Sequence, residues 1–189
     1  ALSMSRIVAG SVGGAPLRVP SSGTRPTSER VREALFSKLE TYQVLQGGRV
    51  VDLCAGSGAL GLEAASRGAS EVALVDCARG AIKACQDNVR RLGLRGVRVV
   101  MAKAQAYTAG PAGSPVDLVF FDPPYDMSEE SVSEVLTPLV RSQDPWLQPH
   151  SVVVVERSTR SPEPTWPAGM HSFTDKKYGE TRLWFAELD

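Results

Sequence analysis

The fold is decided by the stretch Val50-Val51-Asp52-Leu53-Cys54-Ala55-Gly56-Ser57-Gly58-Ala59-Leu60-Gly61, in which an apolar run passes through a glycine-rich turn. The run Val50–Leu53 predicts a buried strand, and Ala59–Ser66 predicts a helix that Gly68 ends. A strand, a glycine turn and a helix in this order begin a βα unit that binds a ligand at the turn. The three glycines fit the spacing G-x-G-x-x-G, which lets the backbone approach a ligand closely.

Similar units follow along the chain. Four more strands are predicted at Val72–Val75, Val97–Met101, Leu118–Phe121 and Val152–Val155, and two more helices at Ala81–Leu92 and Ser128–Val140, the second kinked at Pro138. The strands are nearly continuous apolar runs, as expected of parallel strands covered on both faces. The alternation therefore predicts an α/β fold with a doubly wound parallel sheet. His171–Lys176 and Thr181–Glu187 predict a closing antiparallel pair.

The N-terminal segment has a different pattern. Short apolar pieces around three glycines between Arg6 and Pro20 predict a small hairpin. Thr27 or Ser28 can cap a following helix, which we expect to end before Gly47-Gly48. From Met4, the expected natural start, to Lys38 there are six basic and two acidic residues, a local charge of +4 that would suit contact with phosphates.

Composition narrows the classes of protein. The 189 residues have a formal net charge of +0, which taken alone argues against a nucleic-acid-binding protein. Three cysteines without a Cys-x-x-Cys pair indicate a reducing, cytoplasmic location, and two distant histidines argue against a histidine metal site. We expect no membrane segment, because no apolar stretch is long enough, and we find no secretory signal pattern.

The glycine turn has two interpretations. With Asp76 at the end of the next strand, it also fits a dinucleotide site in which the acid binds ribose hydroxyls, and a nicotinamide-dependent oxidoreductase is therefore an alternative. Asp52 favours the other interpretation, because a carboxylate near the helix N-terminus would repel a pyrophosphate. S-adenosylmethionine has no phosphate, and its cationic groups tolerate an acid there.

A second motif, Asp122-Pro123-Pro124-Tyr125, directly follows the strand Leu118–Phe121. Proline fixes φ and has no N–H, so the carbonyls of this turn are expected to point outward beside a carboxylate and an aromatic ring. Such a rigid group of acceptors next to a stacking surface suits a planar base with an exocyclic amine. A Pro-rich turn without a ligand is the alternative.

Together these pieces resemble a class I amino-group methyltransferase. Three further segments narrow the resemblance to the RsmD family of ribosomal RNA methyltransferases, and they are Arg6-Ile7-Val8-Ala9-Gly10, Arg25-Pro26-Thr27-Ser28-Glu29-Arg30-Val31-Arg32-Glu33-Ala34-Leu35-Phe36 and Lys177-Tyr178-Gly179-Glu180-Thr181. The resemblance runs from Arg6 almost to the C-terminus. It implies a Rossmann-like fold, with a seven-stranded mostly parallel sheet, an antiparallel C-terminal strand and a small N-terminal β-hairpin extension.

The resemblance also implies an activity, which is methyl transfer from S-adenosylmethionine to the N2 amine of a guanine in 16S rRNA. The expected substrate form is a 30S subunit or an assembly intermediate, and we expect a monomer that uses no metal. Residues 4–38 would contact RNA, and residues 39–189 would form the catalytic domain. The implied catalytic residues are Asp122, Pro123, Pro124 and Tyr125, and the implied cofactor-binding residues are Asp52, Cys54, Ala55, Gly56, Gly58, Asp76 and Cys77.

In this hypothesis the Asp122 carboxylate and the Pro123 carbonyl accept the two N–H bonds of the amine, while Tyr125 stacks on the base. One segment departs from the family pattern, since Ala102-Lys103-Ala104-Gln105 stands where an acid or amide often contacts the cofactor adenine. Backbone groups or Gln105 would take that role. An adenine-N6 methyltransferase stays open because it shares the Asp-Pro-Pro-Tyr motif, and so does a non-enzymatic RNA-binding module.

Overall fold

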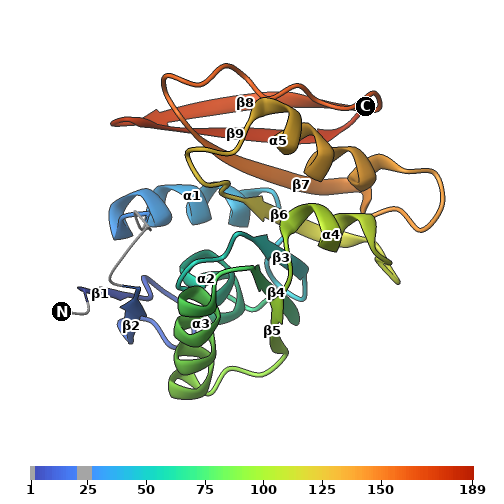
Figure 1. The fold of residues 1–189 in the computed structure, drawn as a ribbon. Coiled ribbons are helices and arrows are strands. Elements are labelled where there is room, and N and C mark those ends of the chain that lie inside the picture. Colours follow the sequence, from blue (N-terminus) through green and yellow to red (C-terminus); the bar gives the residue numbers. More distant parts are fainter. Residues whose placement is uncertain (1–2, 21–26) are drawn as a thin grey trace.

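The computed structural model describes residues 3–20 and 27–189, and its centre is a mixed sheet of seven strands (Figure 1). The strands are β3 (Arg49–Leu53), β4 (Glu71–Asp76), β5 (Val97–Met101), β6 (Val116–Phe121), β7 (Leu147–Ser158), β8 (Met170–Tyr178) and β9 (Thr181–Leu188). Their order across the sheet is β5-β4-β3-β6-β7-β9-β8. Strands β3 to β7 are mutually parallel, and β9 runs antiparallel to both of its neighbours. The predicted doubly wound sheet and its antiparallel closing pair are confirmed.

Helices cover both faces of this sheet. They are α1 (Glu29–Thr41), α2 (Ala59–Ser66), α3 (Arg79–Leu92), α4 (Ala104–Ala109) and α5 (Glu129–Leu136), which continues into a 3₁₀ turn, η1 (Thr137–Val140). Alternate residues of one strand enter different cores: Val50 packs with α1, α2 and α3, whereas Val51 packs with α4 and α5. This alternation explains the continuous apolar runs, because neither face of the strands meets water.

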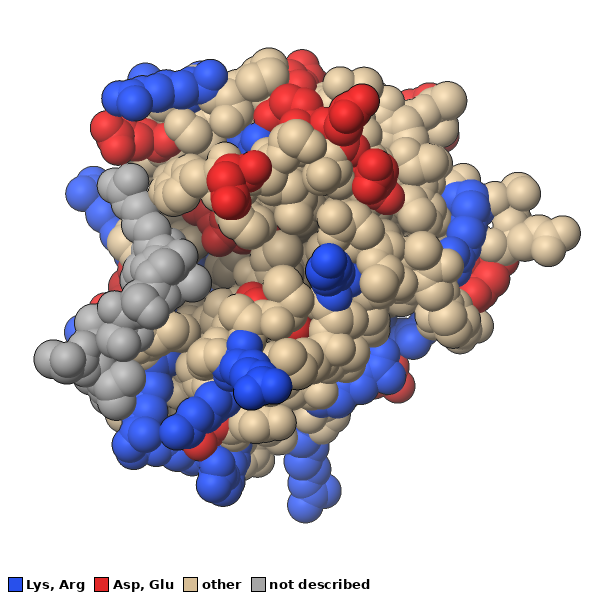
Figure 2. All heavy atoms as spheres, in the orientation of Figure 1, with Lys and Arg blue, Asp and Glu red and all other residues tan. Residues whose placement is uncertain are grey.

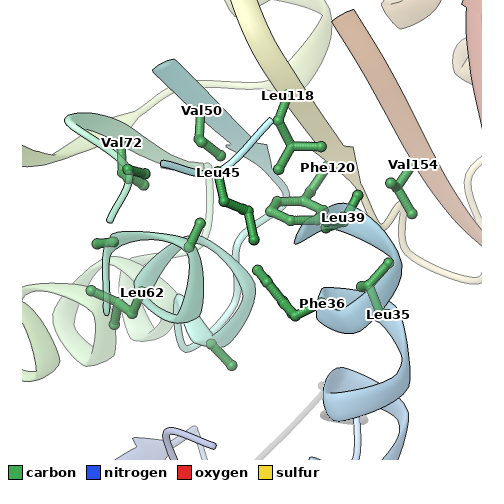
Figure 3. Packing of buried hydrophobic residues seen from close by; sticks show 14 of the residues in the cluster. Leu35, Phe36, Leu39, Leu45, Val50, Leu62, Val72, Leu118, Phe120 and Val154 are labelled. Atoms are coloured by element: carbon green, nitrogen blue, oxygen red, sulfur yellow. The ribbon is translucent and has the colours of Figure 1, made fainter. Parts of the chain in front are cut away.

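The larger core lies between the sheet and helices α1 and α2 (Figure 3). Phe36 of α1 and Phe120 of β6 are fully buried, and their ring centroids are 5.6 Å apart. Leu35 and Leu39 lie on the same face of α1 and are also buried, as the spacing predicted. This packing fixes the first turn of α1 relative to the end of β6, where the Asp-Pro-Pro-Tyr motif begins.

The N-terminal hairpin pairs β1 (Ser3–Arg6) with β2 (Pro16–Val19) and therefore starts earlier in the chain than predicted. Its turn packs on α2, where the fully buried carboxylate of Glu63 accepts hydrogen bonds from the backbone N–H groups of Val8 and Ala9 at 2.8 and 3.0 Å. Ile7 and Leu17 are buried in the larger core. The hairpin is thus a packed part of the fold.

Several predicted boundaries can be compared with the structure. Ser28 is the N-cap of α1 and accepts a hydrogen bond from the Val31 N–H at 3.2 Å. The helix predicted from residue 81 begins at Arg79, and the expected kink at Pro138 takes the form of η1. Helix α4 was not predicted. The proposed division between residues 38 and 39 falls inside α1 and stays a prediction.

Candidate functional site

A cavity of about 620 Å³ opens where β3, β4, β6 and β7 end. The carboxyl ends of parallel strands meet at one edge of a sheet, which is where α/β folds bind their ligands. The wall of the cavity comes from the glycine turn, the end of β4, the Asp-Pro-Pro-Tyr segment, the end of β7, the start of α1 and the β8–β9 turn. Segments far apart in the sequence therefore meet at one site, and both predicted motifs are among them.

Asp52 reaches this wall from the interior of the sheet. Its side chain is 1% exposed, and Oδ2 accepts a hydrogen bond from the Gly61 N–H at 2.9 Å. Burial, with the carboxylates of Asp76 and Glu156 nearby, raises the pKa of Asp52 to about 7, although the hydrogen bond from Gly61 opposes this rise. Asp52 thus binds a backbone N–H at the start of α2, and it also lines the cavity.

Asp76 holds the glycine turn in shape. Its Oδ2 accepts a hydrogen bond from the Gly56 N–H at 2.9 Å, and its Oδ1 accepts one from the Ala78 N–H at 2.9 Å. Gly56 has a φ of 60°, a backbone conformation that glycine adopts without strain. Asp76, Gly56 and the exposed Cys77 all line the cavity. The carboxylate therefore lies between the turn and the open space, where a ligand hydroxyl can reach its remaining lone pairs.

Three other residues of the glycine turn differ in position. Cys54 and Ala55 line the cavity, and burial raises the pKa of the Cys54 thiol, which disfavours a nucleophilic thiolate. Gly58 does not line the cavity. A Cβ built on it would lie 2.9 Å from Leu74 Cδ1, so Gly58 faces the core. The geometry assigns Gly58 to tight packing of the turn and does not support the predicted cofactor contact.

The Asp-Pro-Pro-Tyr segment lies in the cavity wall beside the glycine turn, because β6 is the direct neighbour of β3. The Asp122 N–H donates to the Leu53 carbonyl at 3.3 Å, which ties the segment to β3. Tyr125 is 69% exposed, one of the two large apolar side chains most open to solvent in the described residues. We expected both proline carbonyls of this segment to point outward, and this prediction is only partly correct. The Pro124 carbonyl accepts a hydrogen bond from the Met127 N–H at 3.0 Å, whereas no backbone N–H of the described residues donates to the Pro123 carbonyl.

Several lining residues are not among the predicted site residues, and the polar side chains of Thr27, Glu156 and Arg157 are among them. Burial and the neighbouring Glu156 carboxyl hold the pKa of Asp122 well above its usual range, and Asp52 adds to this while Arg157 opposes it. Glu156 follows the apolar run Val152–Val155 as directly as Asp122 follows its own strand. Searching every strand end for an acid would have found it.

Only part of the predicted basic N-terminal arm is exposed, at Arg6 and Arg30, and its contact with RNA stays a prediction. Arg32 is fully buried and donates to Ser5 Oγ and the Arg6 carbonyl, while Arg25 lies outside the described residues. Instead, exposed basic side chains follow α3 and its C-terminal end, at Arg79, Lys83, Arg90, Arg91 and Arg95. Figure 2 shows basic side chains gathered along the lower part of this face, where α3 lies in Figure 1, and acidic ones in the upper part, near α5.

The part of the chain that the structure describes lacks both a membrane-spanning helix and a cluster of metal-binding side chains. Residues 3–20 and 27–189 contain no helix with the length and apolar character needed to span a membrane. Within the same ranges, no group of three or more His, Cys, Asp or Glu side chains could hold a metal ion.

Comparison with known protein families gives a match over nearly the whole chain. The family described as "Conserved hypothetical protein 95" matches residues 5–187. The "Ribosomal RNA small subunit methyltransferase D" of Escherichia coli K12 is 35% identical over 178 residues, which are 93% of this chain and 85% of that protein. The "Putative rRNA methyltransferase YlbH" of Bacillus subtilis is 35% identical over 136 residues, covering 70% of this chain and 72% of that one.

Solved structures agree in fold. The "Putative methyltransferase yhhF" from Escherichia coli superposes with a TM-score of 0.85 at 32% identity, covering 99% of both chains. A putative RNA methyltransferase from Pyrococcus horikoshii, at 17% identity, has a TM-score of 0.67 and shows the fold alone. The predicted Rossmann-like class I methyltransferase fold is therefore confirmed.

Proposed function

We propose a function from the premise that this chain belongs to the RsmD family of ribosomal RNA methyltransferases. The chain is a methyltransferase that acts on rRNA. We infer in addition that its methyl donor is S-adenosylmethionine and that its acceptor is the N2 amine of a guanine in 16S rRNA. The observation that carries the inference is the meeting of the glycine turn and the Asp-Pro-Pro-Tyr segment, which follow neighbouring strands, in the wall of one cavity.

The geometry of Asp52 favours this donor over a dinucleotide. A pyrophosphate binds the free N–H groups at the start of a helix. Here a buried carboxylate already accepts the Gly61 N–H and lies beside that turn, so a second anion would meet repulsion. S-adenosylmethionine, when bound, supplies a methyl group on a positively charged sulfur. Asp76 is placed to accept its ribose hydroxyls, and the left-handed Gly56 leaves room for close backbone approach.

The acceptor side explains how a poor nucleophile would be activated. The lone pair of an exocyclic amine is delocalised into its ring, and hydrogen bonds from both N–H groups draw the nitrogen towards tetrahedral geometry. The Asp122 carboxyl and the Pro123 carbonyl are the two acceptors of the proposal. Tyr125 presents a solvent-exposed ring on which a base can stack, and such stacking contributes on the order of 1–3 kcal/mol. Correct placement of the two reactants supplies much of the remaining rate.

Asp122→Ala tests the proposed activation. We expect methyl transfer to small-subunit RNA to fall by roughly 100-fold or more, because the variant has lost an acceptor that polarises the amine. Affinity for S-adenosylmethionine, measured by calorimetry, should stay within about 3-fold, since the proposed donor contacts come from the glycine turn and Asp76. Glu130→Ala, an exposed acid of α5, is the matched control. Near-normal transfer by Asp122→Ala would refute the activation role.

Mass analysis of the methylated nucleoside separates the remaining candidates. N2-methylguanosine supports the proposal, N6-methyladenosine supports the adenine alternative, and binding of NAD without methyl transfer supports an oxidoreductase. An absence of any turnover of labelled donor would leave an RNA-binding module. The proposed setting is the bacterial cytoplasm, with a monomer acting without metal on a 30S subunit or an assembly intermediate.

A further inference from the structure

A second acidic side chain lies beside Asp122 in the cavity wall. Strands β6 and β7 are parallel neighbours, and their last paired residues at this edge are Phe121 and Val155. The next residue of each strand segment is an acid, Asp122 on one and Glu156 on the other. Both side chains line the cavity. The register therefore places two carboxyl groups next to each other, on the wall that carries Tyr125.

The two groups are held in a defined arrangement. Burial, followed by the charge and hydrogen bonding of the nearby Glu156 carboxyl, raises the pKa of Asp122. On its other side Glu156 accepts from the Thr27 hydroxyl, whose oxygen is 3.4 and 3.3 Å from the two carboxylate oxygens. Thr27 directly precedes the N-cap of α1, which the core packing fixes. Glu156 is thus oriented by residues on both sides and still faces open space.

Within residues 3–20 and 27–189, no basic side chain forms an ion pair with Glu156. The adjacent Arg157 points its guanidinium at Glu129 of α5, to which it donates a hydrogen bond, and its side chain is 5% exposed. The charge of Arg157 therefore goes to another carboxylate. A carboxyl group at a ligand cavity has oxygen lone pairs that can accept a hydrogen bond from a ligand donor.

The pairing edges of the two candidate bases differ at the atom next to the amine. Guanine presents its N2 amine beside the N1–H, so that two adjacent positions are donors. Adenine presents its N6 amine beside the bare N1, which is an acceptor. Two adjacent carboxyls match the first pattern. An ionised Glu156 side chain would place an acceptor against the lone pair of adenine N1, because a carboxylate has no proton to donate.

We propose that Glu156 is a specificity-determining residue, which accepts the N1–H of guanine while Asp122 binds the neighbouring N2 amine. This inference rests on the proposed function, since it assumes that a base enters this cavity with its amine at Asp122. It assigns the choice of guanine over adenine to a residue outside the Asp-Pro-Pro-Tyr motif. Thr27 is then a positioning residue, which acts through the orientation of Glu156.

The test uses 2-aminopurine, which keeps the 2-amine of guanine but has an unprotonated N1. Once the methylated position is mapped, small-subunit RNA is prepared by ligation with either guanine or 2-aminopurine at that position. The ratio of kcat/KM for the two RNAs is measured for the wild type, for Glu156→Gln and for the control Glu130→Gln. We expect the wild type and the control to favour guanine by roughly 100-fold, the cost of one mispaired buried polar contact.

Glu156→Gln should reduce that preference to less than about 10-fold, because the amide can donate to the bare N1 of 2-aminopurine. The kcat/KM ratio of the variant is divided by the kcat/KM ratio of the wild type. This division cancels the difference in intrinsic reactivity between the amines of guanine and 2-aminopurine. An unchanged preference in Glu156→Gln would overturn the inference. So would a wild type that methylates both RNAs equally, a result that does not depend on how well the variant folds.

The outcomes also separate this inference from the function on which it rests. If the wild type forms N6-methyladenosine or no methylated nucleoside, the proposed function fails. If it forms N2-methylguanosine and Glu156→Gln leaves the preference unaltered, the function stands and only the role of Glu156 fails. Calorimetry with S-adenosylmethionine checks that the variant retains its donor site.

Discussion

At the scale of single residues, the site consists of acids at strand ends whose surroundings give them different properties. Asp76 is bound by two backbone N–H groups, whereas Asp52 receives one and is buried. Asp122 lies against another carboxyl. Hydrogen bonds from backbone N–H groups favour an ionised carboxylate, and burial or a like charge disfavours it. The same residue type at equivalent positions can therefore hold a turn, bind the start of a helix or, as we propose for Asp122, accept hydrogen bonds from a base.

Asp52 gives a prediction about stability and pH. Its pKa is raised from 3.8 to about 7, so the folded protein holds this proton more tightly than the unfolded chain does. The contribution is fully present below the unfolded pKa and is lost as pH rises through the folded one, with about 1.4 kcal/mol lost per pH unit between them. Asp52→Asn cannot ionise and keeps an oxygen for the Gly61 N–H. Between pH 5 and 8 we expect its free energy of unfolding to fall by up to about 3 kcal/mol less than that of the wild type.

Urea unfolding of the cofactor-free protein at pH 5, 6, 7 and 8 measures this difference. Glu130→Gln removes an exposed acid from α5 and should follow the pH dependence of the wild type. Equal pH dependence of Asp52→Asn and the wild type would show that Asp52 ionises as easily in the folded protein as in the unfolded chain.

Tyr125 gives a second prediction at this scale. Its ring is exposed and stacks on no other aromatic ring in the described part of the chain, so its removal should scarcely affect stability. Tyr125→Ala should lower kcat/KM for RNA by about 5- to 150-fold, which corresponds to 1–3 kcal/mol of lost stacking. Tyr125→Phe keeps the ring and should stay near the wild type. A large loss in Tyr125→Phe would instead assign the contribution to the hydroxyl group.

At the scale of elements, the close approach of α2 to β4 depends on Gly61. A Cβ at Gly61 would lie 2.3 Å from Leu74 Cδ2 and 3.2 Å from Asp52 Cβ, and both atoms are buried. Gly80 of α3 has no atom within 4 Å of its Cβ position. We expect Gly61→Ala to destabilise the fold by about 1–3 kcal/mol through overpacking. Gly80→Ala should stabilise it by roughly 0.5–1 kcal/mol through helix propensity.

Thermal and urea unfolding of the two variants are compared directly, because both substitutions add the same methyl group to a glycine. If Gly61→Ala is as stable as Gly80→Ala, α2 can move away from the sheet without cost. In that case the third glycine of the turn would not be required for packing.

The elements that were predicted correctly are those whose pattern depends on burial alone. Val50–Leu53 and Leu118–Phe121 are apolar throughout because both faces of the sheet are covered, and that signal needs no knowledge of partners. Helix α4 has six residues and no side-chain N-cap bond, so neither periodicity nor capping marks it. The start of strand β1 was predicted at the wrong residue. Its pairing depends on β2, and the position of the hairpin depends on contacts with Glu63, which lies 55 positions from Val8.

The candidate site residues could be predicted from the sequence where they belong to one contiguous motif. Asp122, Tyr125 and the glycine turn could be found because each belongs to a short local pattern. Glu156 and Thr27 were missed because they meet Asp122 only through the neighbouring register of β6 and β7 and the packing of α1. Gly58 was assigned to the ligand because spacing alone does not tell which face of a turn points to the core.

At the scale of the whole molecule, the chain has a formal net charge of +0, but its basic and acidic residues gather in different segments. Residues 79–98 contain six basic residues and one acid, while residues 122–134 contain five acids and no base. Removing the N-terminal hairpin would be a poor test of RNA contact, because Ile7 and Leu17 are part of the core and their loss would destabilise the fold. Single exposed charges on α3 are better probes.

Arg91 lies exposed in the last turn of α3, on the basic side, and Lys176 lies exposed on β8. Arg91→Gln should weaken RNA binding and reduce the slope of log K against log salt by about 1, the change expected when one phosphate contact is lost. Lys176→Gln removes the same charge from the distant strand and should leave the slope close to that of the wild type. Filter binding of small-subunit RNA between 50 and 200 mM salt measures both. Equal slopes for the two variants would mean that net charge alone governs RNA affinity and that the α3 surface makes no specific contact with phosphates.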